Sequence, residues 1–78
     1  MVIGFVLMHI SPVYENEIFN TLSQIPEVVE LHTLFGEYDL LAKIEAKDYD
    51  GIGKIIIQKI KTIQGITDTK TLTGKKLK

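Results

Sequence analysis

Apolar and polar residues follow one another along the chain in a pattern that predicts four strands. The run Val2–Ile10 is almost continuously apolar and rich in β-branched residues, which is typical of a strand covered on both faces. The segments Glu27–Phe35 and Leu40–Ala46 alternate between two faces, and Ile66–Thr73 places its four threonines on one side. We expect strands over these ranges, followed by a frayed tail over Gly74–Lys78.

Two further segments have the spacing of amphipathic helices. The first starts at Ser11, the expected N-cap, with Pro12 at the first helical position, and Pro26 ends it. The second starts at Asp48, its expected cap, and Gly65 ends it. Both carry an apolar stripe at helical spacing, formed by Tyr14, Ile18, Leu22 and Ile25 in the first and by Ile52, Ile55, Ile56, Ile60 and Ile63 in the second.

This order of elements is the ferredoxin-like βαββαβ pattern of the α+β class. Right-handed crossovers place both helices on one face of a four-stranded antiparallel sheet, with the first and third strands central and the second at an edge. Strict alternation puts Val29 and Leu31 on one face of the second strand and Val28 on the other, so the helix-free face also carries large apolar residues. Because such a face would be an exposed hydrophobic patch, we expect two copies to dimerise through it.

Length and composition support the need for a second copy. The chain has 78 residues, which predicts one domain over residues 1–78 with a small core. Cysteine is absent, so no disulfide can reinforce that core. Oligomerisation is the remaining source of stability for a domain of this size.

Charge and hydropathy argue against two kinds of partner. Nine basic and ten acidic residues give a formal net charge of −1, whereas nucleic-acid binding needs a basic excess. The apolar start of the chain lacks the basic segment of a signal peptide, and it breaks at His9, too early to span a membrane. We therefore expect a cytoplasmic protein with no direct nucleic-acid or membrane partner.

No arrangement of residues matches a catalytic or metal site. Ser11 is explained as a cap and Ser23 as an ordinary helix position, and neither belongs to a serine–histidine–carboxylate pattern. No glycine-rich phosphate loop is present. His9 and His32 fall on strands that are not neighbours, and two histidines are fewer ligands than a closed metal site needs. We expect no catalytic residue, no metal and no cofactor.

The tetrapeptide Gly36–Asp39 has two interpretations. It can be a plain hairpin turn, with glycine supplying an unusual backbone angle and aspartate bonding nearby N–H groups. It can also bind an amino acid, because Asp39 offers an anion for an α-ammonium group and free N–H groups offer donors for an α-carboxylate. The candidate site then comprises Leu34 and Tyr38 as walls, Gly36, Asp39, and the hydroxyls of Thr69 and Thr71.

Four separate pieces of the chain resemble one known family. They are Ile25–Glu30 with its proline and valines, Gly36–Leu41, Gln64–Ile66, and Thr69–Thr71. In that order and spacing they are similar to the C-terminal domain of the Lrp/AsnC transcriptional regulators, also called the RAM domain. The similarity covers about residues 2–73.

The resemblance implies a ferredoxin-like dimer that joins other dimers in a ring, with effector pockets at the contacts between dimers. It implies that the turn at Gly36–Asp39 and the strand bearing Thr69 and Thr71 line such a pocket. The regulators also carry an N-terminal helix-turn-helix domain, whereas here Met1 opens directly into the first strand. We therefore expect an amino-acid-binding module that acts alone or together with full-length Lrp/AsnC regulators.

Two alternatives from other classes remain open. Dimeric ferredoxin-like barrels include small monooxygenase-type enzymes, which would need polar side chains inside the monomer. The interior stripes here are isoleucine and leucine. RNA-binding sheets of similar shape need aromatic residues on the middle strands, and Phe5 is the one aromatic residue on the first strand.

Overall fold

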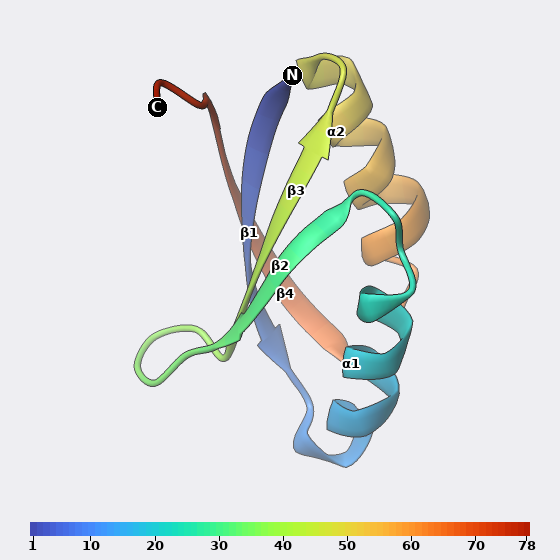
Figure 1. Ribbon diagram of the computed structural model, residues 1–78. Coiled ribbons are helices and arrows are strands. Elements are labelled where there is room, and N and C mark those ends of the chain that lie inside the picture. Colours follow the sequence, from blue (N-terminus) through green and yellow to red (C-terminus); the bar gives the residue numbers. More distant parts are fainter.

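The computed structural model describes residues 1–78, and its strands and helices follow the predicted order (Figure 1). Two predicted strands have their expected bounds, namely the first and the third. The elements are β1 (Val2–Ile10), the 3₁₀ turn η1 (Pro12–Tyr14), α1 (Glu15–Ser23), β2 (Val28–Thr33), β3 (Leu40–Ala46), α2 (Tyr49–Ile55), the π-helical turn η2 (Ile56–Ile60) and β4 (Ile66–Lys75).

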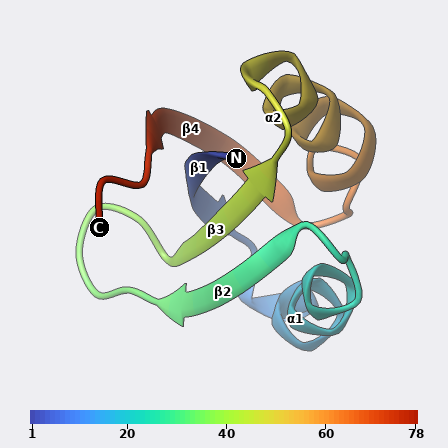
Figure 2. The same cartoon turned by 45° about the horizontal axis from the view of Figure 1, so that its top comes forward.

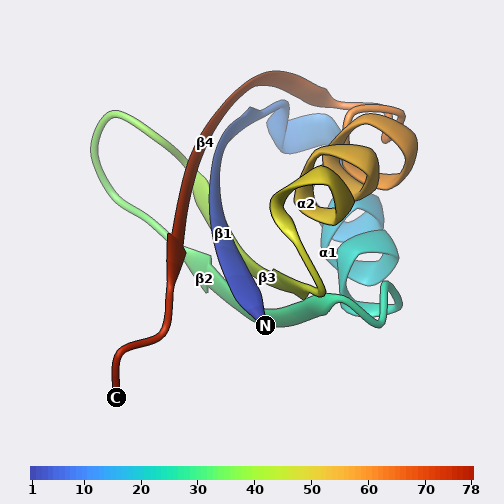
Figure 3. The ribbon, with the colours of Figure 1, turned by 90° about the horizontal axis from the view of Figure 1, so that it is seen from above.

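The four strands form one antiparallel sheet in the order β2-β3-β1-β4. Both helices lie on the same face of this sheet, and the opposite face carries no other element (Figures 2 and 3). β1 lies between β3 and β4, so the first and last strands of the chain are neighbours. The α+β ferredoxin-like fold predicted from the pattern is confirmed.

The core lies between the helices and the two central strands. Leu40, Ala42, Ile44 and Ala46 alternate inward along β3 as predicted, and they meet the apolar stripes of α1 and α2. Every buried side chain in this layer is apolar. The buried set comprises Val6, Met8, Ile18, Leu22, Ile25, Leu40, Ala42, Ile44, Ala46, Ile52, Ile55, Ile56 and Ile60.

The sequence predicted a capping residue at the start of each helix, and one of the two makes the expected side-chain hydrogen bond. Asp48 Oδ1 accepts a hydrogen bond of 2.7 Å from the backbone N–H of Gly51, which confirms the N-cap of α2. Ser11 occupies the N-cap position of η1, but its side chain makes no capping bond, so that part of the prediction is wrong. Pro12 starts a single 3₁₀ turn, and the α-helix proper begins at Glu15.

β2 departs from strict alternation because it contains a bulge. The register shifts between Val28 and Glu30, which inserts one extra residue and reverses the alternation beyond it. As a result Val28 and Leu31 both pack against the core, whereas the sequence predicted opposite faces for them. The strand also ends at Thr33, two residues before its predicted end.

The C-terminal half differs in two places. β4 continues to Lys75, so the predicted tail begins later, because β1 offers Val2 and Ile3 as partners for Lys75 and Gly74. The second helix widens into a π-helical turn over Ile56–Ile60 and ends there, before Gly65. Gly65 instead forms the turn into β4 with a φ of +100°, a region that favours glycine.

Candidate functional site: the loop between β2 and β3

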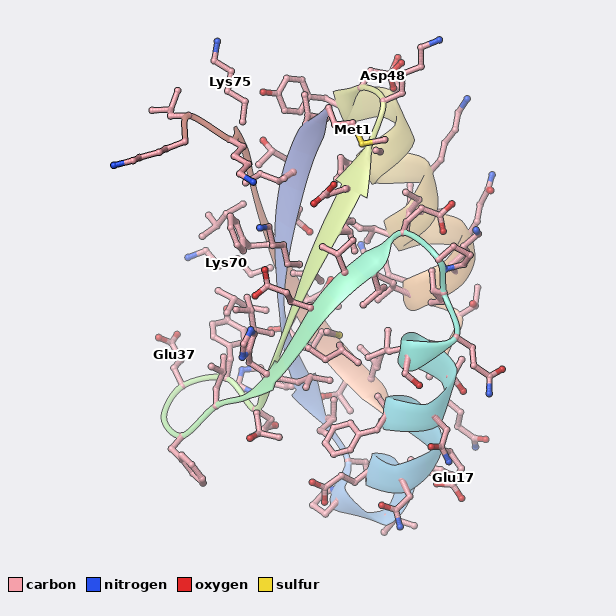
Figure 4. The ribbon with its side chains drawn as sticks, in the orientation of Figure 1. Met1, Glu17, Glu37, Asp48, Lys70 and Lys75 are labelled. Atoms are coloured by element: carbon pink, nitrogen blue, oxygen red, sulfur yellow. The ribbon has the colours of Figure 1, made fainter.

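The loop over residues 34–39 projects away from the helices, on the side of the helix-free face (Figures 1 and 3). Glu37 marks its far end (Figure 4). Gly36 has a φ of +137°, which favours glycine, and no atom lies within 4 Å of a Cβ added there. Phe35 is 100% exposed. The tip of the loop therefore makes little contact with the rest of the chain, and its base determines its position.

Hydrogen bonds hold the base of the loop on the end of β1. The N–H of Leu34 donates to the carbonyl oxygen of Asp39 at 2.9 Å, which closes the loop on itself. The N–H of Asp39 donates to the carbonyl oxygen of Met8 at 2.9 Å. The N–H of Ile10 donates to Asp39 Oδ2 at 3.0 Å. The carboxylate of Asp39 thus ties the loop to β1 close to the register shift between His9 and Ile10.

His9 adds a second attachment. Its ring stacks on that of Tyr38 with 4.6 Å between centroids, and its Nδ1 lies 3.8 Å from Asp39 Oδ2. Across the sheet, His9 pairs with Asp68 of β4. His9 and Asp39 side chains are 37% and 49% exposed, so this group of residues is open to solvent.

Four consecutive backbone donors of the loop are free. The N–H groups of Phe35, Gly36, Glu37 and Tyr38 make no backbone hydrogen bond within the chain, in contrast to those of Leu34 and Asp39. Free N–H groups along a turn attract anions such as a carboxylate. The loop therefore presents an anion at its base and donors along its length.

Thr69 and Thr71 lie on the other side of β1. They pair with Met8 and Val6, whose side chains point into the helix layer, so both threonines belong to the helix-side face of the edge strand β4. Thr69 lines an open hollow of about 320 Å³ together with Lys61, Ile66, Thr67 and Asp68. Asp39 lines a different hollow of about 120 Å³, with Ile10, Pro12 and Glu15.

Four of the six predicted site residues lie together within a single copy of the chain. Leu34, Gly36, Tyr38 and Asp39 belong to the same loop, with Leu34 half-buried at its base. Thr69 and Thr71 are at the same end of the sheet but face the helix side, and neither hollow joins them to Asp39.

The sequence did not predict His9 as a member of this site, because the histidine was considered as a metal ligand or as a polar residue near a strand end or in the dimer interface, and not as a partner of the loop. The signal was available in the topology. Once β1 is placed beside β3, the residue before β3 must lie next to the end of β1. Asp39 immediately precedes Leu40, which pairs with Met8, and His9 follows Met8. The two histidines do lie on non-adjacent strands, as expected, since β3 separates β1 from β2.

A more apolar hollow of about 310 Å³ lies between α1 and the edge strand β2, and the sequence did not predict it. Phe19 and Leu31 supply most of its apolar wall, and its full lining is Phe19, Asn20, Ser23, Leu31, His32, Thr33 and Leu40. It exists because Phe19 lies beside the buried stripe of α1 and is only partly covered. It holds no charged carboxylate, so it lacks the anion that an ammonium group needs.

The shifted carboxylate pKa values belong to ion pairs outside the loop. Lys59 Nζ donates to both oxygens of Glu27, at 2.9 and 3.1 Å, and lowers the pKa of that carboxyl. On the helix-free face, hydrogen bonds from His32 and Lys43 lower the pKa of Glu30. Lys59 thus joins the residue before β2 to η2, and Lys43 joins the middle of β2 to β3.

A four-stranded antiparallel sheet with both helices on one face defines the class of α+β ferredoxin-like domains. The match to a known family makes the assignment specific. Residues 3–73 match the Lrp/AsnC ligand binding domain, and the chain belongs to this family.

Sequences similar to this chain occur in two kinds of protein. The chain is 35% identical over 74 residues to an uncharacterized HTH-type transcriptional regulator of Pyrococcus furiosus, covering 91% of this chain and 49% of that protein. It is also 39% identical over 61 residues to a homocitrate synthase of Sulfurisphaera tokodaii, covering 78% of this chain and 13% of the enzyme. The chain therefore spans about half the length of the regulator that it matches.

Solved structures agree with the fold. The crystal structure of FFRP-DM1 has a TM-score of 0.88 at 34% identity, covering 95% of this chain and 99% of that one. AsnC of Escherichia coli has a TM-score of 0.87 at 27% identity, covering 94% of this chain and 50% of AsnC. A transcriptional regulator of Neisseria meningitidis in complex with L-methionine has a TM-score of 0.89 at 18% identity, covering 97% of this chain and 51% of that one, and shows the same fold. No helix in the chain is long and apolar enough to cross a membrane.

Proposed function

We propose that this chain is an effector-binding module that holds an amino acid at the loop over residues 34–39. The observation that carries the proposal is the match of residues 3–73 to a family defined by ligand binding. The loop supplies suitable chemistry, with the Asp39 carboxylate for an ammonium group and the free N–H groups of Gly36, Glu37 and Tyr38 for a carboxylate. The regulator of known structure that holds L-methionine makes an amino acid the first ligand to test.

The proposed site needs a second surface to enclose its ligand. The hollow beside Asp39 is about 120 Å³ and open, which is smaller than the pockets that typically bury a small molecule, roughly 300–1,000 Å³. Thr69 and Thr71 do not line this hollow, and they face the helix side of β4 in the same chain. We propose that a neighbouring copy in a ring of dimers brings its own surface, including these threonines, against the loop.

The module is proposed to act on other proteins rather than as an enzyme. The enzyme alternative required polar side chains inside the monomer, and the buried residues are all apolar. The same domain occurs in regulators and within a much longer enzyme. Full-length Lrp/AsnC regulators, whose matching domains share this fold, are the partners that we propose for co-assembly.

Calorimetry with each of the twenty amino acids tests the proposed function. We expect at least one to bind with saturable heat. Protection of the loop N–H groups in NMR spectra should accompany binding and place the ligand at residues 34–39. Absence of binding by all twenty, or binding that leaves the loop unchanged, would contradict the proposal.

A further inference from the structure

We propose that His9 is the positioning residue of this loop and that its protonation regulates the charge which Asp39 presents to a ligand. The inference deepens the proposed function, because it concerns the same loop, but its first test needs no ligand. It rests on the geometry at the end of β1, where one side chain contacts both Tyr38 and Asp39.

These contacts make His9 the second side chain, beside Asp39, that joins the loop to the sheet. Tyr38 stacks on one face of the imidazole ring at 4.6 Å. Asp39 Oδ2 lies 3.8 Å from Nδ1 while it accepts the Ile10 N–H at 3.0 Å. The backbone of His9 is itself fixed, since Thr67 Oγ1 donates to its carbonyl oxygen at 3.3 Å. A change of charge on the imidazole therefore acts on Asp39 without a change in the strand.

Most of the charged groups around His9 are carboxylates. Asp39 approaches from the loop, and Asp68 is its direct cross-strand neighbour on β4. Glu15 of α1 shares the small hollow with Asp39. Lys70 lies on the same face of β4, two pairs farther along the strand, opposite Leu7. Tyr38 is the remaining titratable neighbour.

The direction of the effect follows from these charges. Histidine is the side chain that changes charge between about pH 5 and pH 8. When His9 carries a proton, it is attracted to Asp39, the loop is held more firmly, and the anion is partly neutralised. A ligand ammonium group must then compete with the imidazolium. Binding through Asp39 should therefore be weaker, by about three- to tenfold, when His9 carries a proton than when it does not.

NMR of the unliganded protein tests the inference directly, and His32 provides the matched control. His32 is the other histidine, it lies on β2, and its Nε2 contacts Glu30 rather than the loop. We expect the amide signals of Tyr38 and Asp39 to change with pH together with the signals of the His9 ring. His9→Gln should abolish this pH dependence, and His32→Gln should leave it in place. Loop signals that titrate equally in wild type and His9→Gln would overturn the proposal.

A second experiment separates failure of this inference from failure of the proposed function. Affinity for L-methionine is measured by calorimetry near pH 5.5 and near pH 8 in wild type and in both variants. Weaker binding at the lower pH in wild type and His32→Gln, but not in His9→Gln, supports the inference. Binding with the same pH dependence in all three proteins overturns it. If methionine does not bind at all, the NMR titration still decides the role of His9, and the failure belongs to the proposed ligand.

Discussion

Asp39 holds the loop through one carboxylate oxygen, and its other oxygen has no hydrogen-bond partner in the chain. Oδ2 accepts the Ile10 N–H and faces His9, while Oδ1 makes no hydrogen bond within the chain. The two interpretations of the tetrapeptide, a turn and a binding site, are therefore compatible at this residue. A substitution that keeps an acceptor but removes the charge can separate them.

The replacement Asp39→Asn should reduce amino-acid affinity with little effect on stability. An asparagine oxygen can still accept from Ile10, so the loop keeps its anchor. Loss of a charge-assisted bond to the ligand is worth roughly 1.5–3 kcal/mol, or about ten- to a hundredfold in affinity. Calorimetry and thermal unfolding measure the two effects.

The control for this substitution is Asp50→Asn, which removes the same charge from the exposed first turn of α2. It should leave affinity unchanged. If Asp39→Asn also binds with wild-type affinity, Asp39 is a structural residue only and the ligand site lies elsewhere.

At the scale of the elements, Gly65 allows the start of β4 to pack closely against the start of α1. A Cβ at this position would lie 2.6 Å from Cβ of Tyr14 and 3.0 Å from Cδ1 of Ile18. Gln64 Nε2 also donates to the Tyr14 hydroxyl at 3.0 Å, and the N–H of Ser11 donates to the Gly65 carbonyl at 2.7 Å. These contacts join the start of α1 to the start of β4.

We expect Gly65→Ala to lower the free energy of unfolding by roughly 1–3 kcal/mol, because it combines an unfavourable positive φ with a clash against Tyr14. Gly53→Ala is the matched control, since no atom lies within 4 Å of its added Cβ and the residue is helical. That variant should gain stability, by up to about 1 kcal/mol. Chemical denaturation of both proteins tests the pair, and equal stabilities would contradict the close packing described here.

An element could be predicted from the sequence where its hydrophobic pattern depended on its own residues alone. β3 alternates strictly over Leu40–Ala46, so its bounds and its inward face could be predicted. The bulge in β2 could not, because the shift between Val28 and Glu30 depends on pairing with β3 rather than on residue type. The extension of β4 to Lys75 likewise depends on Val2 of β1, more than seventy positions away in sequence.

The site was partly predictable for the same reason. Gly36 and Asp39 are residue types that favour turns, and their loop was expected between two strands. The attachment of Tyr38 to His9 joins residues that are distant in sequence, so only the strand order could reveal it. The joint placement of Thr69 and Thr71 with the loop stays a prediction, because it depends on a contact between copies.

At the scale of the whole molecule, the helix-free face of the sheet has no covering element. Ile3, Phe5, Leu7 and Leu41 are partly buried there by their neighbours, and Leu72 is 50% exposed. Lys43, Lys70 and Glu45 lie among them or at their margin, and Figure 4 shows Lys70 pointing away from the helices. Cations and anions occur on the same face, so two copies related by a two-fold axis can pair opposite charges.

We expect Phe5→Glu to convert a dimer into an 8.8 kDa monomer in sedimentation experiments. Phe5 is central on the helix-free face, and a carboxylate there would be desolvated opposite an apolar surface. Because Phe5 points away from the core, circular dichroism should show the fold retained. Ile57→Glu, at a 64% exposed position of η2, is the control and should remain dimeric. A wild-type protein that is monomeric at all concentrations would rule out this assembly.

The place of β1 between β3 and β4 has a consequence for synthesis of the chain. As the polypeptide emerges from the ribosome, β1, α1, β2, β3 and α2 can assemble a three-stranded sheet before β4 exists. During that interval the edge of β1 facing β4 has unpaired N–H and C=O groups, which can pair with a strand of another nascent chain. Arrival of Ile66–Lys75 closes that edge, so β4 should protect β1 from such pairing.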